Sequence, residues 1–147
     1  MTKAADATES GIELPDGYTP SAKEPFMNER QKEYFRRKLL AWKDEIIEES
    51  KSTLELLQED MGTLPDMADR ASNETDRSLE LRARDRQRKL VSKIDSALRR
   101  IDEGNYGYCE DTGEPIGLAR LDARPVATLS LDAQERHERN ERVHRDD

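Results

Sequence analysis

Apolar side chains recur at steps of three and four residues from Asn28 to Gly62, which is the period of one face of an α-helix. Asn28 can cap this helix together with Gln31, and Gly62 can end it. Ser50 stands where the next apolar residue is due, so the stripe drifts in the middle of the helix. The stripe consists of Phe35, Leu39, Trp42, Ile46, Leu54, Leu57 and Met61.

A second stretch with the same period extends from Asn73 to Gly104. Asn73 with Asp76 can start this helix, and Gly104 suits the position just after its end. Its apolar or small residues are Leu79, Ala83, Leu90, Ile94, Ala97 and Ile101. Two helices of similar length joined by a short segment predict an antiparallel coiled-coil hairpin whose tip lies at residues 63–73.

The chain on either side of the hairpin has a different character. Residues 1–25 contain three prolines and few large apolar side chains, which predicts a flexible segment. Residues 105–129 are rich in glycine and tyrosine and favour a small β-hairpin around 111–114. Residues 131–145 indicate a terminal helix capped either by Ser130 or by Asp132 with Glu135. The predicted fold class is mainly α, with a flexible segment over 1–25, the hairpin over 26–104, and a degenerate zinc-finger-like module with a C-terminal helix over 105–147.

Composition narrows the choice of architecture. Of the 147 residues, 33% are hydrophobic and 39% are charged, and the mean hydropathy is -1.04. These values disfavour a thick sheet core and leave elongated helical packing or disorder. The sequence has neither a run of 18 apolar residues nor a secretory signal after Met1, so we expect no membrane span and a cytoplasmic protein.

The distribution of charge bears on binding partners. The net charge of -8 argues against direct binding to DNA or to an anionic membrane. Residues 43–60 hold seven acidic and two basic side chains, whereas residues 74–100 hold nine basic and five acidic ones. We therefore expect ion pairs along the seam of the hairpin and interpret the basic run 82–93 as a partner of the acidic helix.

The segment around the single cysteine, Cys109, has the spacing of a zinc ribbon. Cys109, Thr112, Ser130 and Ala133 match a C-x2-C-x15–20-C-x2-C pattern. Three of these positions cannot supply the thiolates that such a site uses. We therefore expect no zinc and no cofactor, with Cys109 as a small buried side chain. No nucleophile elbow, P-loop or dinucleotide loop is present, so we expect no enzyme activity.

Several motifs together resemble the DksA family of bacterial transcription factors. They are FMNE at 26–29, FRR at 35–37, AW at 41–42, PDMADRA at 65–71, SLELR at 78–82, RDRQRKL at 84–90, YGYC at 106–109 and RLDARP at 120–125. The likeness covers roughly residues 20–136, and the D-x-x-D-x-A sequence of the tip is its most specific part. Many members of the family carry a four-cysteine zinc finger. This chain has only Cys109, so it resembles the cysteine-poor branch of the family.

The resemblance implies a hairpin that enters the secondary channel of bacterial RNA polymerase. The tip residues Asp66, Asp69 and Ala71 would lie near the active site, and Arg86 and Leu90 would contact the polymerase rim. With the alarmone guanosine tetraphosphate, such factors repress ribosomal RNA promoters and activate biosynthetic ones in the stringent response. The resemblance also implies binding to polymerase rather than to DNA, and we expect a monomer.

The resemblance also implies an alarmone site between the factor and the polymerase rim. The matching positions are Leu90, Lys93, Arg124 and Gln134, the last of which is commonly a lysine in the family. Two alternatives remain open from sequence. One is a Gre-type transcript-cleavage factor, which Ala71 and the lack of a Gre-type C-terminal domain disfavour. The other is a generic coiled-coil adaptor without a polymerase role.

Overall fold

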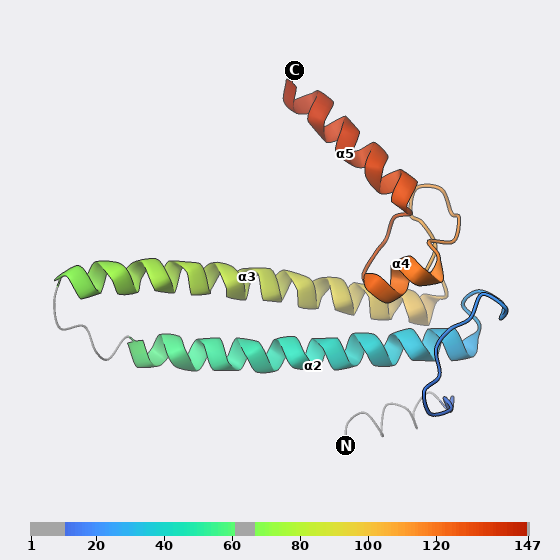
Figure 1. The fold of residues 1–147 in the computed structure, drawn as a ribbon, viewed down its shortest axis with the longest axis horizontal. Coiled ribbons are helices and arrows are strands. Elements are labelled where there is room, and N and C mark those ends of the chain that lie inside the picture. Colours follow the sequence, from blue (N-terminus) through green and yellow to red (C-terminus); the bar gives the residue numbers. More distant parts are fainter. Residues whose placement is uncertain (1–10, 61–66, 147) are drawn as a thin grey trace. The chain divides into compact units, whose positions relative to one another are not determined.

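The computed structural model describes residues 11–60 and 67–146, which form four helices and no strand (Figure 1). The helices are α2 (Glu29–Asp60), α3 (Met67–Glu103), α4 (Leu118–Ala123) and α5 (Leu131–Asp146). The chain forms two compact units. We name them the base unit, Met1–Leu40 with Ser96–Asp147, and the arm unit, Ala41–Asp95. The predicted class, mainly α with a helical hairpin, is confirmed.

The start of α2 and the end of α3 follow from local chemistry. The backbone N–H of Gln31 donates to Asn28 Oδ1 at 2.9 Å, which confirms the predicted cap of α2. At the end of α3, Gly104 has a φ of 84°, a left-handed conformation that favours glycine. The expected start of α3 at Asn73 is wrong, because the helix begins at Met67. No glycine or proline occurs between these two residues, so nothing in the sequence ends the helix there.

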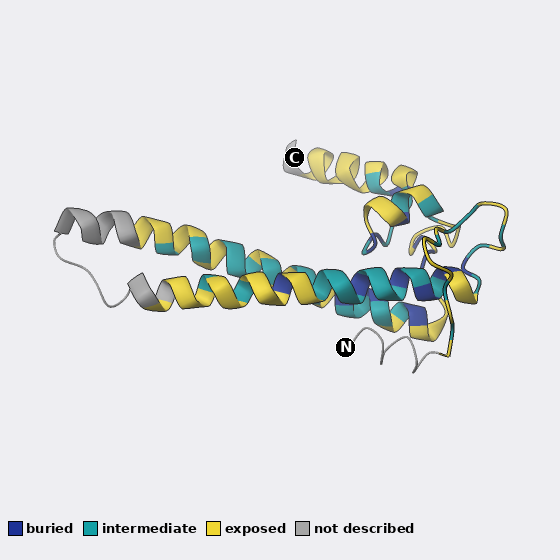
Figure 2. Cartoon of the chain, turned by 60° about the horizontal axis from the view of Figure 1, so that its bottom comes forward, coloured by how far each residue is buried: buried dark blue, intermediate teal, exposed yellow. Residues whose placement is uncertain are grey.

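In the arm unit, the parts of α2 and α3 run antiparallel, and most of their described residues are exposed or half-buried (Figure 2). Ile46 and Ile94 are buried, but Leu54 and Leu79 are exposed, although both belong to the predicted stripes. Ser50, at the drift of the stripe, donates to Gln87 Oε1 at 2.8 Å. The arm unit is therefore held by few buried apolar contacts.

The core of the protein lies in the base unit. Phe35 and Leu39 of α2 are fully buried there, as is Ala97 of α3, and Ile101 of α3 is buried as well. The remaining buried apolar residues come from outside α2 and α3: Met27, Tyr106, Cys109, Leu121, Ala127 and Ala133. The segment that follows α3 is thus packed onto the open end of the hairpin.

Residues 105–117 form a loop with one isolated antiparallel bridge, between Tyr108 and Pro115. Cys109 N–H donates to the carbonyl oxygen of Glu114 at 2.8 Å, and Ile116 N–H donates to that of Gly107 at 2.8 Å. The predicted β-hairpin is reduced to this bridge, because Pro115 has no N–H with which to extend the ladder. The short helix α4 was not predicted.

Residues 11–28 pack against α2 as a series of turns. Gln31, fully buried, accepts a hydrogen bond from Met27 N–H at 2.7 Å and donates to the carbonyl oxygen of Ser21 at 3.2 Å. Arg37 donates to the carbonyl oxygen of Ile12 at 3.0 Å. The predicted flexible segment, 1–25, therefore makes specific contacts from residue 11 onward, and its first ten residues lie outside the described part. No described helix is both long and apolar enough to cross a membrane.

Candidate functional site

The tip of the hairpin falls at the edge of the described part of the chain. Asp66 lies outside it. Asp69 and Ala71 belong to the first turns of α3, and their side chains are outside the described set. The roles of these three residues stay predictions.

Three arginines in the basic run of α3, residues 82–93 of the arm unit, form no ion pair with the described residues. Arg82 and Arg86 are exposed and Arg84 is half-buried, and none of the three guanidinium groups has an ion-pair partner among the described residues. The neighbouring Arg88 and Lys89 pair within the helix, both with Asp85, at 2.6 and 3.2 Å. The interpretation of this run as a partner of the acidic helix is therefore wrong for the three free arginines.

One ion pair of the arm unit crosses the seam within the described residues, between Lys43 and Asp95 at 2.7 Å. Among the described residues of the arm unit, no other acidic side chain of α2 pairs with a basic side chain of α3. Opposite net charge on two helices does not bring their side chains together when those side chains lie on solvent-facing positions.

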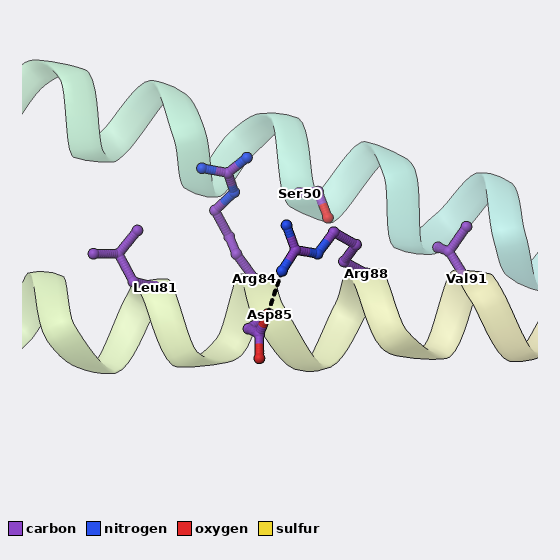
Figure 3. Close-up of a pocket in the computed structure, with 6 residues that line it drawn as sticks. All are labelled: Ser50, Leu81, Arg84, Asp85, Arg88 and Val91. Carbon is purple, nitrogen blue, oxygen red and sulfur yellow. Dashed lines mark hydrogen bonds and ion pairs between the residues drawn. The ribbon is translucent and has the colours of Figure 1, made fainter.

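A cavity of about 420 Å³ opens beside Arg84, one of the three free arginines (Figure 3). Leu81 and Arg84 point from α3 toward α2, and Ser50 projects from α2 toward α3. The lining residues are Ser50, Leu81, Arg84, Asp85, Arg88 and Val91. The cavity lies where the apolar stripe of α2 is interrupted by Ser50, so incomplete packing of the seam accounts for it.

The predicted alarmone residues are divided between the two units. Leu90, half-buried, and Lys93, exposed and unpaired among the described residues, belong to the arm unit. Arg124 and Gln134 belong to the base unit. Gln134 is half-buried, and its amide nitrogen donates to Glu138 Oε1 at 3.2 Å. That the four residues form one site stays a prediction.

Arg124 itself is exposed, and its guanidinium has no partner among the described residues. Its backbone closes α4, because its N–H donates to the carbonyl oxygen of Arg120 at 2.8 Å. The carbonyl oxygen of Arg124 in turn accepts from Ala127 N–H at 3.0 Å. The structure thus presents a free cation from an ordered turn.

Sequence reasoning missed a polar cluster that joins α4 to α2. Asp122 Oδ1 accepts hydrogen bonds from the Tyr34 hydroxyl at 2.8 Å and from Lys38 Nζ at 2.6 Å. Burial, followed by the hydrogen bond to Asp122, raises the pKa of Tyr34 to about 12. The bond from Lys38 and then that from Tyr34 lower the pKa of Asp122. The three residues are far apart in sequence, and only the fold brings them together.

The four positions with zinc-ribbon spacing lie around Cys109. The Cys109 side chain is buried, as predicted. Burial by itself raises the pKa of its thiol, but hydrogen bonds from Thr112 and Ser130 outweigh that effect and bring it to about 6. Ala133 is fully buried, and its N–H donates to Ser130 Oγ at 3.3 Å, which confirms Ser130 as the cap of α5.

These features define a class of protein: a helical hairpin followed by a small module in which four positions have the spacing of zinc-ribbon ligands. Residues 31–101 match the N-terminal domain of the DnaK suppressor protein DksA, and residues 104–139 match the prokaryotic dksA/traR C4-type zinc finger. The chain belongs to the DksA family.

Similar proteins support this assignment along most of the chain. An RNA polymerase-binding transcription factor DksA from Caulobacter vibrioides is 70% identical over 130 residues, covering 88% of this chain and 92% of that protein. The DksA of Escherichia coli K12 is 43% identical over 117 residues, covering 80% and 78%. The structure of the transcription factor DksA2 from Pseudomonas aeruginosa superposes with a TM-score of 0.75 at 43% identity, covering 84% of this chain and 94% of that one.

The match of residues 104–139 to a C4-type zinc finger contradicts the expectation of a module without zinc or any other cofactor. That expectation was based on the absence of three thiolates. It did not take into account that the whole segment belongs to a zinc-finger family. In this chain the four positions provide one thiol, two hydroxyls and a methyl group, a donor set that does not fit a four-thiolate site. Within residues 11–60 and 67–146, no three His, Cys, Asp or Glu side chains are grouped to hold a metal ion.

Proposed function

We propose that this protein is a transcription regulator that binds bacterial RNA polymerase through its secondary channel. With guanosine tetraphosphate, it represses ribosomal RNA promoters and activates biosynthetic ones. The observation that carries the proposal is the set of free arginines on α3, Arg82, Arg84 and Arg86. They lie within the segment that matches the DksA N-terminal domain, whose relatives are named as RNA polymerase-binding factors.

The chemistry of these arginines suits an acidic protein surface. A guanidinium can donate two parallel hydrogen bonds to one carboxylate, and each charge-assisted bond contributes roughly 1.5–3 kcal/mol. Because Arg86 is exposed and has no partner among the described residues, it gives up no existing ion pair on binding. Leu90 follows four residues later, on the same side of the helix, and adds an apolar contact at the polymerase rim.

The tip acts by contact rather than by chemistry in this proposal. Asp66 and Asp69 supply two carboxylates, which are too few for a metal cage made by the protein alone. Ala71 keeps the surface small where close approach to the polymerase active site is needed. The relatives are named as transcription factors and not as enzymes, so we infer a regulator without catalytic activity.

The alarmone would bind at Leu90, Lys93, Arg124 and Gln134 against the polymerase. Lys93 and Arg124 are both exposed and without partners among the described residues, so both cations are available to a polyphosphate. Gln134 carries no charge and is already bonded to Glu138. The alarmone response should therefore be present but weaker than with a lysine at this position.

The remaining partner predictions follow from the same proposal. A net charge of -8 is compatible with recruitment by polymerase and unfavourable for direct contact with DNA. We infer a monomer that acts where the polymerase acts, in the cytoplasm.

Run-off transcription from a ribosomal RNA promoter, with and without guanosine tetraphosphate, tests this function. We expect the protein to repress the promoter and the alarmone to strengthen repression. Asp69→Asn keeps the size of the side chain and removes its charge, so it should abolish repression while binding to polymerase persists. Transcript cleavage instead of promoter repression would identify a Gre-type factor, and the absence of any effect on transcription would favour a generic adaptor.

A further inference from the structure

The turn that carries Arg124 is fixed to the rest of the base unit on both of its sides. Preceding it, Asp122 is bonded to α2, and following it, Pro125 is bonded to Tyr106. Arg124 itself is exposed and has no partner among the described residues. Several polar contacts therefore hold the backbone around Arg124, although the side chain of Arg124 is itself free.

The first anchor is the cluster around Asp122. In addition to the two bonds that its carboxylate accepts from Tyr34 and Lys38, its backbone carbonyl oxygen accepts from Lys38 Nζ at 2.8 Å. Tyr34 and Lys38 lie one turn apart on α2, so they hold Asp122 from one face of that helix. Two of the three bonds are donated by an ammonium group, which makes them stronger than neutral ones.

The second anchor lies one residue after Arg124. The hydroxyl of Tyr106 donates to the carbonyl oxygen of Pro125 at 2.7 Å, in a buried position. The Tyr106 ring packs in turn against Phe35 of α2, with 5.6 Å between the ring centroids. Both anchors thus lead back to the same stretch of α2, between residues 34 and 38.

We propose that Tyr34 and Lys38, acting through Asp122, are positioning residues that hold Arg124 ready for a polyphosphate ligand. This inference rests on the alarmone role proposed above for Arg124. Bidentate recognition of a phosphate requires the guanidinium to be aligned with two oxygens. A backbone that is already ordered loses less conformational entropy when the ligand binds, which increases affinity without any further contact to the ligand.

Asp122→Ala tests the first anchor, with Asp102→Ala as its matched control. Asp102 pairs with Arg36, which also lies on α2, but it belongs to α3 and, among the described residues, forms no hydrogen bond or ion pair with α4. In the complex with polymerase, we expect Asp122→Ala to weaken guanosine tetraphosphate binding by about tenfold, the equivalent of one hydrogen bond to a charged group. Affinity for polymerase without the alarmone should change less than about twofold. The control should alter neither quantity, and equal losses in both variants would overturn the proposal.

A double-mutant cycle shows whether the anchor acts through Arg124. In an Arg124→Ala background, Asp122→Ala should cause no further loss of alarmone affinity. If the tenfold loss persists there, the cluster acts by another route and the positioning role is wrong. Lys38→Arg, which keeps a charged donor, should retain more alarmone affinity than Lys38→Ala.

Amide hydrogen exchange in the free protein separates this inference from the proposed function. We expect the amides of Arg124 and Ala127 to exchange faster in Asp122→Ala than in the wild type, and to be unchanged in Asp102→Ala. Unchanged exchange in Asp122→Ala would overturn the anchor itself. If Arg124→Ala leaves alarmone binding intact while exchange responds as expected, the fault lies in the proposed effector role of Arg124 and not in the anchor.

Discussion

The ring of Phe35 on α2 packs against the ring of Tyr106, with centroids 5.6 Å apart and 48° between the ring planes. Both side chains are almost completely buried. Phe35 belongs to α2 and Tyr106 to the loop that follows α3, so the contact joins residues far apart in the sequence. It joins the segment after α3 to the open end of the hairpin, so the stability of the base unit should depend on it.

Phe35→Ala should lower the free energy of unfolding by about 3–5 kcal/mol, because it removes a large ring from a packed site and leaves a cavity. Urea denaturation followed by circular dichroism measures the change. Leu131→Ala is the control, since Leu131 is 58% exposed and its truncation should cost less than about 0.5 kcal/mol. Equal effects of the two substitutions would contradict this view of the core.

Asp122 should contribute to stability in a pH-dependent manner. Its pKa in the folded protein is lowered, chiefly by the hydrogen bond from Lys38 and then by that from Tyr34. Between the lowered pKa and the ordinary value of 3.8, the unfolded chain binds more protons than the folded one, so stability falls as the pH falls. The contribution is complete above the ordinary value and lost below the lowered one.

Unfolding of the wild type and of Asp122→Asn, compared from neutral pH down to about pH 2, measures this contribution. The stability difference between the two proteins should be constant near neutrality and shrink below the ordinary aspartate pKa. Because the side chain of Asp122 is 53% exposed, we expect a small effect that salt weakens further. A difference that grows on acidification would have the wrong sign.

The polar contact between Ser50 and Gln87 should reduce the stability of the arm unit. Ser50 interrupts the apolar stripe of α2, and Gln87 faces it across the seam at 2.8 Å. Replacing both by leucine restores the stripe and should raise the free energy of unfolding by about 1–2 kcal/mol. Ser52→Leu, at an exposed position of the same helix, should change stability by less than about 0.5 kcal/mol in thermal or urea unfolding. A loss of stability in the double variant would show that the polar contact is favourable.

Gln134→Lys should strengthen the response to guanosine tetraphosphate. The substitution adds a cation where the present amide donates to Glu138, and a charged donor to phosphate contributes roughly 1.5–3 kcal/mol when well placed. Titration of the alarmone in a promoter-repression assay should give a lower half-maximal concentration than the wild type. Ser130, at the cap of α5, is left intact, so helix content should not change. If the half-maximal concentration of the alarmone is unchanged, Gln134 does not belong to the alarmone site.

The long helices could be read from the sequence because their signals are local. The capping pair Asn28 and Gln31 sets the start of α2, and an apolar period of three and four residues marks both helices. The start of α3 was placed too late, because Asn73 is a good cap by chemistry but nothing before it interrupts the helix. Helix α4 was missed, since six residues are too few to show a period.

The candidate sites were predictable to different degrees. Arg86, Lys93 and Arg124 were named from motifs, and each is found exposed and without a partner among the described residues. The cluster of Tyr34, Lys38 and Asp122 could not be found in the same way, because its members meet only through the packing of α4 on α2. The expectation about zinc failed for a different reason. It was argued from individual ligand positions, whereas the match to the zinc-finger family extends over the whole segment 104–139.

Binding of the protein to bacterial RNA polymerase, measured for the wild type, Arg86→Glu and Lys51→Glu, tests the central claim most directly. Lys51 is the control because it is an exposed cation of the arm unit, on α2, outside the basic run. The account predicts tight binding of the wild type and of Lys51→Glu, and a loss of at least about tenfold for Arg86→Glu, as expected when a charge-assisted contact is reversed in sign. Equal affinity of all three proteins, or no binding of the wild type, would contradict it.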